Sequence, residues 1–499
     1  MAQLLFDHIV VLMLENRSFD HLFGHLGKGD GLPQDAVNYL KPGDASTQAF
    51  KTGHGGDFTA VGEGPSHSLK QTNEQLFGAA KPTPAQSAAV PPLDGFVASF
   101  NTCLIPKLKR KATPTELQQV MNVFEPEQLP VLSMLAREFV LCDRWFADVP
   151  GPTMPNRAFV HAATSQGYTY NADWKPTFTC KTIYDRINAS NGRCSWRVYR
   201  HDHDDVLQLY PDLEKNLTNH VHFETNFLQD VAGDNLATYS FIDPSFLGST
   251  RTNQPTNSMH APADVRPAEK LIADVYGALQ ANPDVWKKTL LIVLFDEHGG
   301  YYDHVPPPAT VSPDGIDGHL DQEFLVPFDF KRLGLRVPAI LVSPWFPAAL
   351  DQTVYSHSTI PGSVIDAFGL GEYLTERDKQ ANKLTAKYLL KQDGLAWRDD
   401  VPTLVPPPQP ELMNELQHEI LNGSVLRDPH PENRVLIRTH DITDQAQAKV
   451  FVGTQNAKLL EHYFASKGGK KGAKEASTEN QRASAFLSPA RIAELRESV

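Results

Sequence analysis

Four short apolar runs constrain the fold of this 499-residue chain more than any other feature of its sequence. They span residues 8–14 (HIVVLML), 238–243 (TYSFID), 290–296 (LLIVLFD) and 337–343 (VPAILVS). Runs this short and rich in β-branched residues are typical of strands that are buried on both faces, as in a parallel sheet. Apolar residues at helical spacing in 129–139 and 265–279 predict amphipathic helices between the strands. Alternating strands and helices indicate an α/β protein.

Stretches rich in glycine, proline and polar residues interrupt this pattern at about 27–125 and 303–330, and both are expected to be long insertions that contribute loops. The main domain would then occupy residues 1–430. We expect residues 431–499 to form a helical extension, with a flexible linker at about 466–482 and a short last helix at 489–497.

The charge balance bears on partners and on location. With 46 Lys and Arg against 59 Asp and Glu, the net charge of −13 argues against nucleic-acid binding and favours small molecules or metals. No run of about 18 apolar residues could span a bilayer. Glu15, Arg17 and Asp20 interrupt the first apolar stretch, so a signal peptide is not expected; the chain as written would be cytoplasmic, or a mature exported form. Cys180 and Cys194 could close one loop in an oxidising compartment.

Pairs of oxygen-bearing side chains follow two of the predicted strands. Glu15 and Asn16 come directly after the first run, and Asp296 and Glu297 stand at the end of the third. In open α/β sheets ligands bind at the carboxyl ends of strands, and carboxylate and amide oxygens suit a hard cation. Two adjacent carboxylates after a buried strand repel each other unless a cation neutralises them. The alternatives are a strand-to-helix turn capped by Asn16 or Ser18, and an acidic surface turn.

The segment GPTMPNR places Thr153 beside the start of a predicted helix. Free backbone N–H groups and the helix dipole favour an alkoxide or an anion at that position. Asn156 and Arg157 are suitable donors to phosphate oxygens. The alternative is ordinary capping, with Thr153 as the N-cap and Pro155 in the first turn.

Several histidines lie in predicted loops or at the ends of elements, namely His67, His201, His203, His260 and His357, although any one of the 19 is more often a surface or packing residue. The chain contains no G-x-S-x-G, H-E-x-x-H, Walker A or strand-linked G-x-G-x-x-G motif. Serine hydrolases, zincins, nucleotide hydrolases and dinucleotide enzymes therefore lack their usual signatures here.

Five separated motifs, ENRSFDHLFG, GPTMPNR, DEHGGYYDHVPPP, VPAILVSPW and SHSTI, occur in this order within residues 5–370. Together they make the chain resemble the phosphoesterase family of non-specific phospholipases C and acid phosphatases. The resemblance implies an alkaline-phosphatase-like three-layer sandwich, with a mostly parallel central sheet, helices on both faces and long loop insertions. One local departure is His298, where many members of the family have asparagine.

The resemblance also implies roles for individual residues. Thr153 would be the nucleophile and form a phosphothreonine. One divalent metal ion (Ca²⁺, Mg²⁺ or Zn²⁺) would be held by Glu15, Asn16, Thr153, Asp296 and Glu297. Catalytic side chains around the phosphate would be His67, His203, His260 and Asp202, and substrate would be bound by Asn156, Arg157 and His67.

The expected reaction is phospholipase C-like cleavage of phosphatidylcholine-type diesters into diacylglycerol and a phosphorylated head group. An acid phosphatase acting on monoesters is the alternative, and a non-catalytic metal-binding scaffold is a more distant one. Residues 75–105 are apolar enough to approach a lipid substrate in transient contact with a membrane surface, but the same stretch suits an ordinary packed insertion.

Overall fold

The structure is a computed structural model that describes residues 6–171, 178–248, 255–318 and 327–384. The predicted extension at 431–499, its linker and its last helix lie outside the described residues, and so does the boundary at 430.

An eight-stranded sheet forms the centre of the molecule, in the order β13-β6-β12-β11-β1-β10-β8-β9. Its strands are β1 (His8–Leu14), β6 (Val140–Cys142), β8 (Trp196–Arg200), β9 (His220–His222), β10 (Tyr239–Asp243), β11 (Thr289–Phe295), β12 (Ala339–Val342) and β13 (Ala349–Asp351). All four apolar runs form strands of this sheet, and β1 lies between β10 and β11, parallel to both. The α/β class and the mostly parallel sheet are thus confirmed.

The strand formed by the fourth run is antiparallel. β12 runs antiparallel to β11 on one side and to β6 on the other, so a parallel orientation for this run is wrong. A parallel return requires a crossover, usually a helix. No helix lies among the described residues between β11 and β12, where the insertion at 303–330 was predicted. The chain therefore enters β12 at the same end of the sheet at which it left β11.

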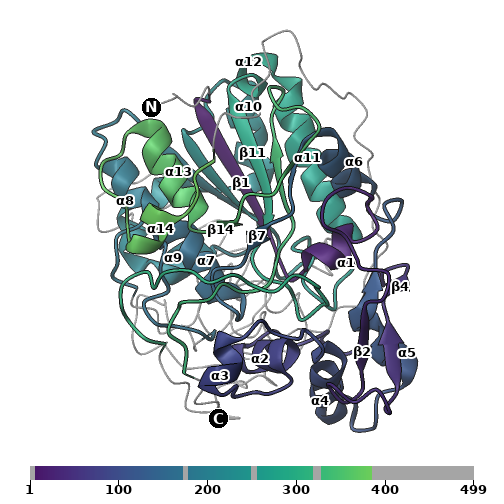
Figure 1. The fold of residues 1–499 in the computed structure, drawn as a ribbon. Coiled ribbons are helices and arrows are strands. Elements are labelled where there is room, and N and C mark those ends of the chain that lie inside the picture. The colour runs from purple at the N-terminus through teal and green to yellow at the C-terminus, as the bar shows by residue number, and fades with distance from the viewer. Residues whose placement is uncertain (1–5, 172–177, 249–254, 319–326, 385–499) are drawn as a thin grey trace, which may run out of the picture.

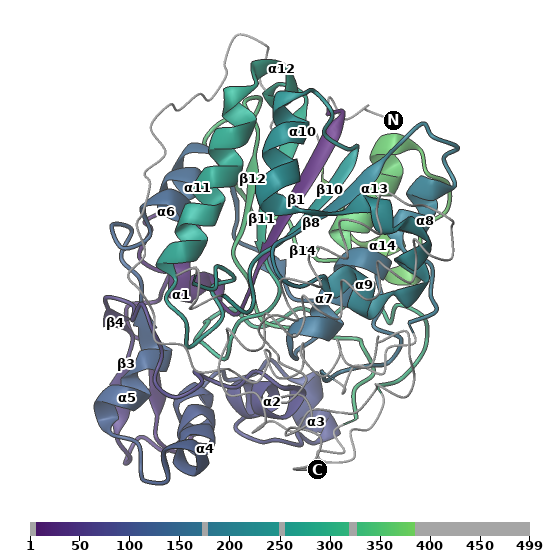
Figure 2. The same cartoon turned by 180° about the vertical axis from the view of Figure 1, so that it is seen from behind.

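Helices cover both faces of the sheet (Figures 1 and 2). One layer contains α6 (Pro130–Glu138), α10 (Leu228–Ala232), α11 (Arg266–Ala281) and α12 (Pro283–Trp286). The other contains α7 (Thr153–Ala162), α8 (Ile183–Asn188), α9 (Asp205–Leu209) and α13 (Thr359–Phe368). The predicted helices at 129–139 and 265–279 are α6 and α11, whose apolar residues join the main core. This three-layer arrangement is the predicted sandwich.

Smaller elements complete the described chain. They are α1 (Phe19–Phe23), α14 (Glu376–Gln380), the paired strands β7 (Trp145–Phe146) and β14 (Tyr355–Ser356), 3₁₀ turns at Gln119–Met121 and Pro211–Asn219, and a π-helical turn at Phe223–Phe227. None of the described helices is long and apolar enough to cross a membrane. Cys180 and Cys194 form no disulfide with each other or with any other described cysteine.

The insertion at 27–125 is more than a set of loops. It contains β2 (Val37–Tyr39), β3 (Ala49–Lys51), β4 (Gly53–His54), β5 (Asn122–Val123), α2 (Leu69–Phe77), α3 (Pro84–Ala88), α4 (Phe96–Leu108) and α5 (Pro114–Gln118). Helices α2, α4 and α5 pack around a small core of their own, and they lie beyond the end of the sheet toward which β1 points (Figure 1). Within 75–105, Phe96, Phe100 and Leu104 are buried in that core, whereas Val90 (78% exposed) and Ile105 (42%) face outward.

Candidate active site

Two predicted pairs of polar residues meet at the carboxyl end of the sheet. β1 and β11 run side by side in register, with Leu14 opposite Phe295, so the residues that follow each strand are neighbours. Glu15, Asn16, Asp296 and Glu297 are all fully buried, which excludes the acidic surface turn. The sequence therefore brings three carboxyl groups into one solvent-free region.

Asn16 ties the two strand ends together. Its backbone N–H donates to Asp296 Oδ1 (3.1 Å), and its Nδ2 donates to Glu297 Oε1 (3.0 Å). The Oδ1 of Asn16 accepts the backbone N–H of Ala261 (3.2 Å). Asn16 has a φ of 71°, and the adjacent Gly299 has a φ of 67° and packs directly against the Asn16 backbone. Both loops thus adopt left-handed turns that asparagine and glycine tolerate best.

The carboxyl groups are poorly compensated by positive charge. Burial raises the pKa of Glu15 and Glu297 well above the usual range and that of Asp296 to about 6, while Arg157 opposes the shift at Glu15 and Asp296. The Arg157 guanidinium lies 3.6 Å from Glu15 Oε1 and 3.5 Å from Asp296 Oδ2. Both oxygens of Glu15 and Oδ2 of Asp296 are buried and accept no hydrogen bond from any described residue. Buried carboxylate oxygens without donors suit a bound cation, and an all-oxygen set favours Ca²⁺ or Mg²⁺.

Thr153 is the first residue of α7. Pro152, in extended conformation, occupies the N-cap position, and Thr153 makes no capping hydrogen bond, so the capping interpretation is wrong. The Oγ1 of Thr153 is buried and has no hydrogen-bond partner among the described residues. Arg157 follows one turn later on the same helical face, where it contacts Glu15 and Asp296. Arg157 therefore connects α7, the helix that begins at Thr153, to the carboxyl groups of Glu15 and Asp296.

Asn156 and Arg157 are already engaged with the protein. The Nδ2 of Asn156 donates to the carbonyl oxygens of Val149, Gly151 and Pro152, and its Oδ1 accepts the N–H of Val149, which folds this loop onto α7. Arg157 is fully buried. Both side chains hold the scaffold around Thr153, and their substrate-binding role stays a prediction.

Two aspartates that the sequence analysis did not select surround Arg157. Its Nη1 donates to Asp205 Oδ2 (2.8 Å) and to Asp243 Oδ1 (3.2 Å). Burial works against ionisation of Asp205, but Arg157 lowers its pKa overall; burial and Asp205 raise the pKa of Asp243 well above its usual range. The pKa values of the two aspartates are thus shifted in opposite directions around one guanidinium. Asp243 ends the second apolar run, and that position was its sequence signal, whereas Asp205 had none.

His67 and His260 lie side by side, next to the Asn16 and Glu297 side chains. Their rings make an edge-to-face contact with centroids 5.8 Å apart. The Nδ1 of His67 accepts a hydrogen bond from Asn16 Nδ2 (3.2 Å), and its Nε2 lies 3.5 Å from Glu297 Oε1. The structure therefore places both histidines next to the predicted metal ligands.

His203 and Asp202 lie on the other side of Arg157. The rings of His203 and Phe246 are 6.0 Å apart, and the Arg157 guanidinium lies over the same Phe246 ring. Asp202 accepts the backbone N–H groups of residues 246, 247 and 248 and the hydroxyl of Ser245. Its carboxylate therefore braces a turn in this structure, and its catalytic role stays a prediction. His201 points elsewhere, donating to the carbonyl oxygen of Asp243 and stacking on Phe223.

Two further histidines hold the Asp296–Glu297 loop. His357 Nε2 donates to the carbonyl oxygen of Asp296 (2.6 Å). His298 Nε2 donates to Gln75 Oε1 in α2 (2.8 Å), and Gln75 Nε2 donates to the carbonyl oxygen of Ser66, next to His67. Gln75 carried no sequence signal, because its role depends entirely on where α2 packs.

Comparisons with known proteins bear on the family of this chain. A model of the Phosphoesterase family matches residues 6–371. Non-specific phospholipase C5 of Arabidopsis thaliana is 34% identical over 401 residues, which are 75% of this chain and 72% of that protein. Phospholipase C B of Mycobacterium tuberculosis is 28% identical over 413 residues, 71% of this chain and 72% of that protein. A solved protein of the alkaline phosphatase superfamily from Vibrio parahaemolyticus is 13% identical, with a TM-score of 0.31, covering 52% of this chain and 65% of that chain.

The family match extends over both strand-end pairs, α7 with Thr153, and the loops that carry His67 and His260. The plant phospholipases C are similar over three quarters of this chain and nearly as much of their own length. This chain therefore belongs to the Phosphoesterase family and is a hydrolase of phosphoric ester bonds.

Proposed function

We propose that this chain is a phospholipase C that cleaves phosphatidylcholine-type diesters through a phosphothreonine at Thr153, with one divalent cation. The observation that carries the proposal is the buried Thr153 hydroxyl, which no described residue engages, at the start of α7, the helix whose Arg157 contacts the buried Glu15 and Asp296. The names of the plant and bacterial relatives, which are phospholipases C, support the diester substrate.

The cation would be held by Glu15, Asn16, Asp296 and Glu297, with the hydroxyl of Thr153 completing the set. When bound there, a divalent cation supplies positive charge that lowers the pKa of a nearby hydroxyl and offsets charge on a phosphoryl oxygen. The donor-free oxygens of Glu15 and Asp296 support this assignment.

The chain's own residues then carry the chemistry. The Thr153 hydroxyl loses its proton to solvent, and the positive end of α7 favours the alkoxide, whose oxygen attacks phosphorus and forms a new P–O bond. The bond from phosphorus to the diacylglycerol oxygen breaks, and that oxygen takes a proton from His260 or His203. A water molecule next attacks phosphorus, breaks the bond to Thr153 and releases the phosphorylated head group. One proton of that water passes to the threonine oxygen, and the histidine is reprotonated from solvent.

The test compares p-nitrophenylphosphorylcholine with p-nitrophenyl phosphate between pH 5 and 8, for the wild type, Thr153→Ala and Thr153→Ser. Thr153→Ala should lower turnover at least ~10³-fold, because the covalent step is lost, while the circular dichroism spectrum is unchanged. Acid quenching during turnover should trap phosphate on Thr153, detectable by peptide mass spectrometry. Near-wild-type turnover by Thr153→Ala would refute the nucleophile, and a preference for the monoester would assign acid phosphatase activity instead.

A further inference from the structure

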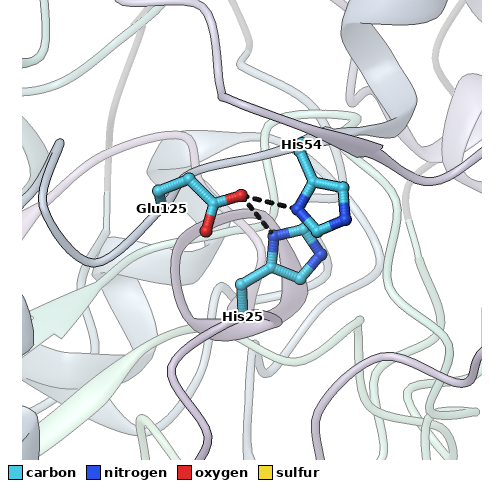
Figure 3. A group of neighbouring side chains, drawn as sticks. All are labelled: His25, His54 and Glu125. Carbon is cyan, nitrogen blue, oxygen red and sulfur yellow. Dashed lines mark hydrogen bonds and ion pairs between the residues drawn. The ribbon is translucent and has the colours of Figure 1, made fainter.

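A second cluster of metal-ligating side chains lies away from Thr153. His25, His54 and Glu125 converge so that their ligand atoms all lie within 4.8 Å of one another (Figure 3). The Nδ1 atoms of His25 and His54 lie 3.1 Å and 2.7 Å from the same oxygen, Oε1 of Glu125. The two imidazole rings are stacked, with centroids 4.3 Å apart. Three donor atoms of metal-binding type therefore point at one another.

The fold brings these residues together from three separate segments. His25 follows α1, the helix that begins just after Glu15 and Asn16. His54 ends β4, which pairs with β5 so that His54 is opposite Val123, two residues before Glu125. The N–H of Phe124 donates to the carbonyl oxygen of His21 (2.9 Å), which fixes α1 against β5. The cluster thus lies where the chain enters and leaves the insertion at 27–125.

The charge environment separates this cluster from the other group of carboxylates and histidine. Asp20, Asp303 and His304 also gather, but the buried Arg336 donates to Asp20 Oδ1 and Asp303 Oδ1, each at 2.9 Å, and neutralises them. In the described part of the chain no lysine or arginine pairs with Glu125. The ionic partners of the Glu125 carboxylate among the described residues are the two imidazoles, whose ring nitrogens are themselves metal-binding atoms.

We propose that His25, His54 and Glu125 bind one transition-metal ion of the Zn²⁺ class. Two imidazole nitrogens and one carboxylate oxygen suit Zn²⁺ better than the hard cations expected at the active site. The side chain of His54 is 82% exposed and that of Glu125 is 34% exposed, whereas that of His25 is only 17% exposed. Solvent thus reaches the cluster from one side, which leaves a coordination position for water.

The bound ion would connect the main domain to the insertion. It would cross-link α1, which belongs to the main domain, to β4 and to the segment after β5, which belong to the insertion. An ion that binds the folded chain and not the unfolded chain stabilises the folded state by its free energy of binding. The insertion supplies Gln75 and His67 to the active site, so the bound ion would hold the insertion in position at that site. The proposal does not depend on the phospholipase assignment.

The test is calorimetric titration of the metal-stripped full chain with Zn²⁺, for the wild type, His54→Ala, Glu125→Gln and the control His222→Ala in β9. His54→Ala alters an exposed side chain and should leave the fold intact, which circular dichroism would check. His54→Ala and Glu125→Gln each remove a direct ligand and should weaken the affinity of one site for Zn²⁺ at least ~100-fold. Loss of a residue that only supports a metal ligand already costs up to about 100-fold in affinity. Any binding of Zn²⁺ by Glu15, Asn16, Asp296 and Glu297 should be the same in all four proteins.

Zn²⁺ should also raise the melting temperature of the wild type and of His222→Ala more than that of His54→Ala or Glu125→Gln. The readout is binding and stability, so it holds whatever substrate the enzyme prefers. If His54→Ala and Glu125→Gln bind the same number of Zn²⁺ ions with the same Kd as the wild type, the proposal is overturned. The same is true if the wild type binds no Zn²⁺ that is lost in both His54→Ala and Glu125→Gln.

Discussion

Replacing Gly299 by alanine should damage both stability and activity, because this glycine fits against the Asn16 backbone with no room for a side chain. A Cβ at this position would lie 2.1 Å from the Asn16 carbonyl oxygen and 2.9 Å from Asn16 Oδ1. An ordinary contact begins near 3.4 Å, so the two loops would have to separate by about 1.3 Å, the difference between 3.4 and 2.1 Å. The backbone at Gly299 also has a φ of +67°, which alanine adopts only under strain.

The expected loss of unfolding free energy follows from these two effects. The left-handed conformation costs alanine about 1–2 kcal/mol, and forcing a packed neighbour aside typically costs about 1–3 kcal/mol. Together they give about 2–5 kcal/mol, a large part of the roughly 5–15 kcal/mol that stabilises a typical protein. Turnover should also fall at least ~10-fold, because shifting a residue that helps position the reacting groups by about 1 Å has large effects on rate.

Gly369 provides the matched control. It caps α13 with a φ of +60°, and a Cβ there would meet nothing within 4 Å. Gly369→Ala should therefore show the conformational cost alone, about 1–2 kcal/mol, with normal turnover. Urea denaturation followed by circular dichroism, together with the p-nitrophenyl assays, measures both variants. Equal denaturation midpoints and equal turnover for Gly299→Ala and Gly369→Ala would refute the reasoning.

Two further substitutions test the surroundings of the site. Gln75→Leu removes the hydrogen bonds that link His298 to the loop that carries His67, and it should lower kcat about 10-fold, as loss of a supporting hydrogen bond does. Gln75→Glu keeps the acceptor for His298 and should recover part of this loss. An unchanged kcat in Gln75→Leu would contradict the role of this link. Burial lowers the pKa of His161 to about 4, so the folded protein resists protonation that the unfolded chain accepts near pH 6.5. Stability is therefore lost as the pH falls from 6.5 toward 4, by about 2 kcal/mol between pH 7 and 5 from this residue. His161→Phe should remove that part of the loss in urea midpoints measured at both pH values, and an unchanged pH dependence would exclude His161 as its source.

The sequence was sufficient for four strands of the central sheet, for helices α6 and α11, and for the two pairs of polar residues at the strand ends. Short β-branched runs such as residues 8–14 are explained only by burial on both faces, and the position of Asp296 and Glu297 after such a run fixes them at the edge of the sheet. These predictions rest on the spacing and the local density of apolar residues, which can be read directly from the sequence. The same holds for Thr153 at the start of α7, where the flanking prolines mark the beginning of the helix.

What the sequence could not determine is which groups meet across the molecule. Local hydrophobicity is the same for a strand in either direction, so only the packed structure shows that β12 is antiparallel. A side chain's hydrogen-bonding capacity says nothing about its partners, and Asn156 and Asp202 turn out to bind backbone groups in this structure. His25, His54 and Glu125 are distant in the chain and become neighbours only because β4 pairs with β5 beside α1. The sequence by itself determined which runs form buried strands and where those strands end. Tertiary packing decided which side chains face one another, because contacts between side chains depend on distances in space rather than along the chain.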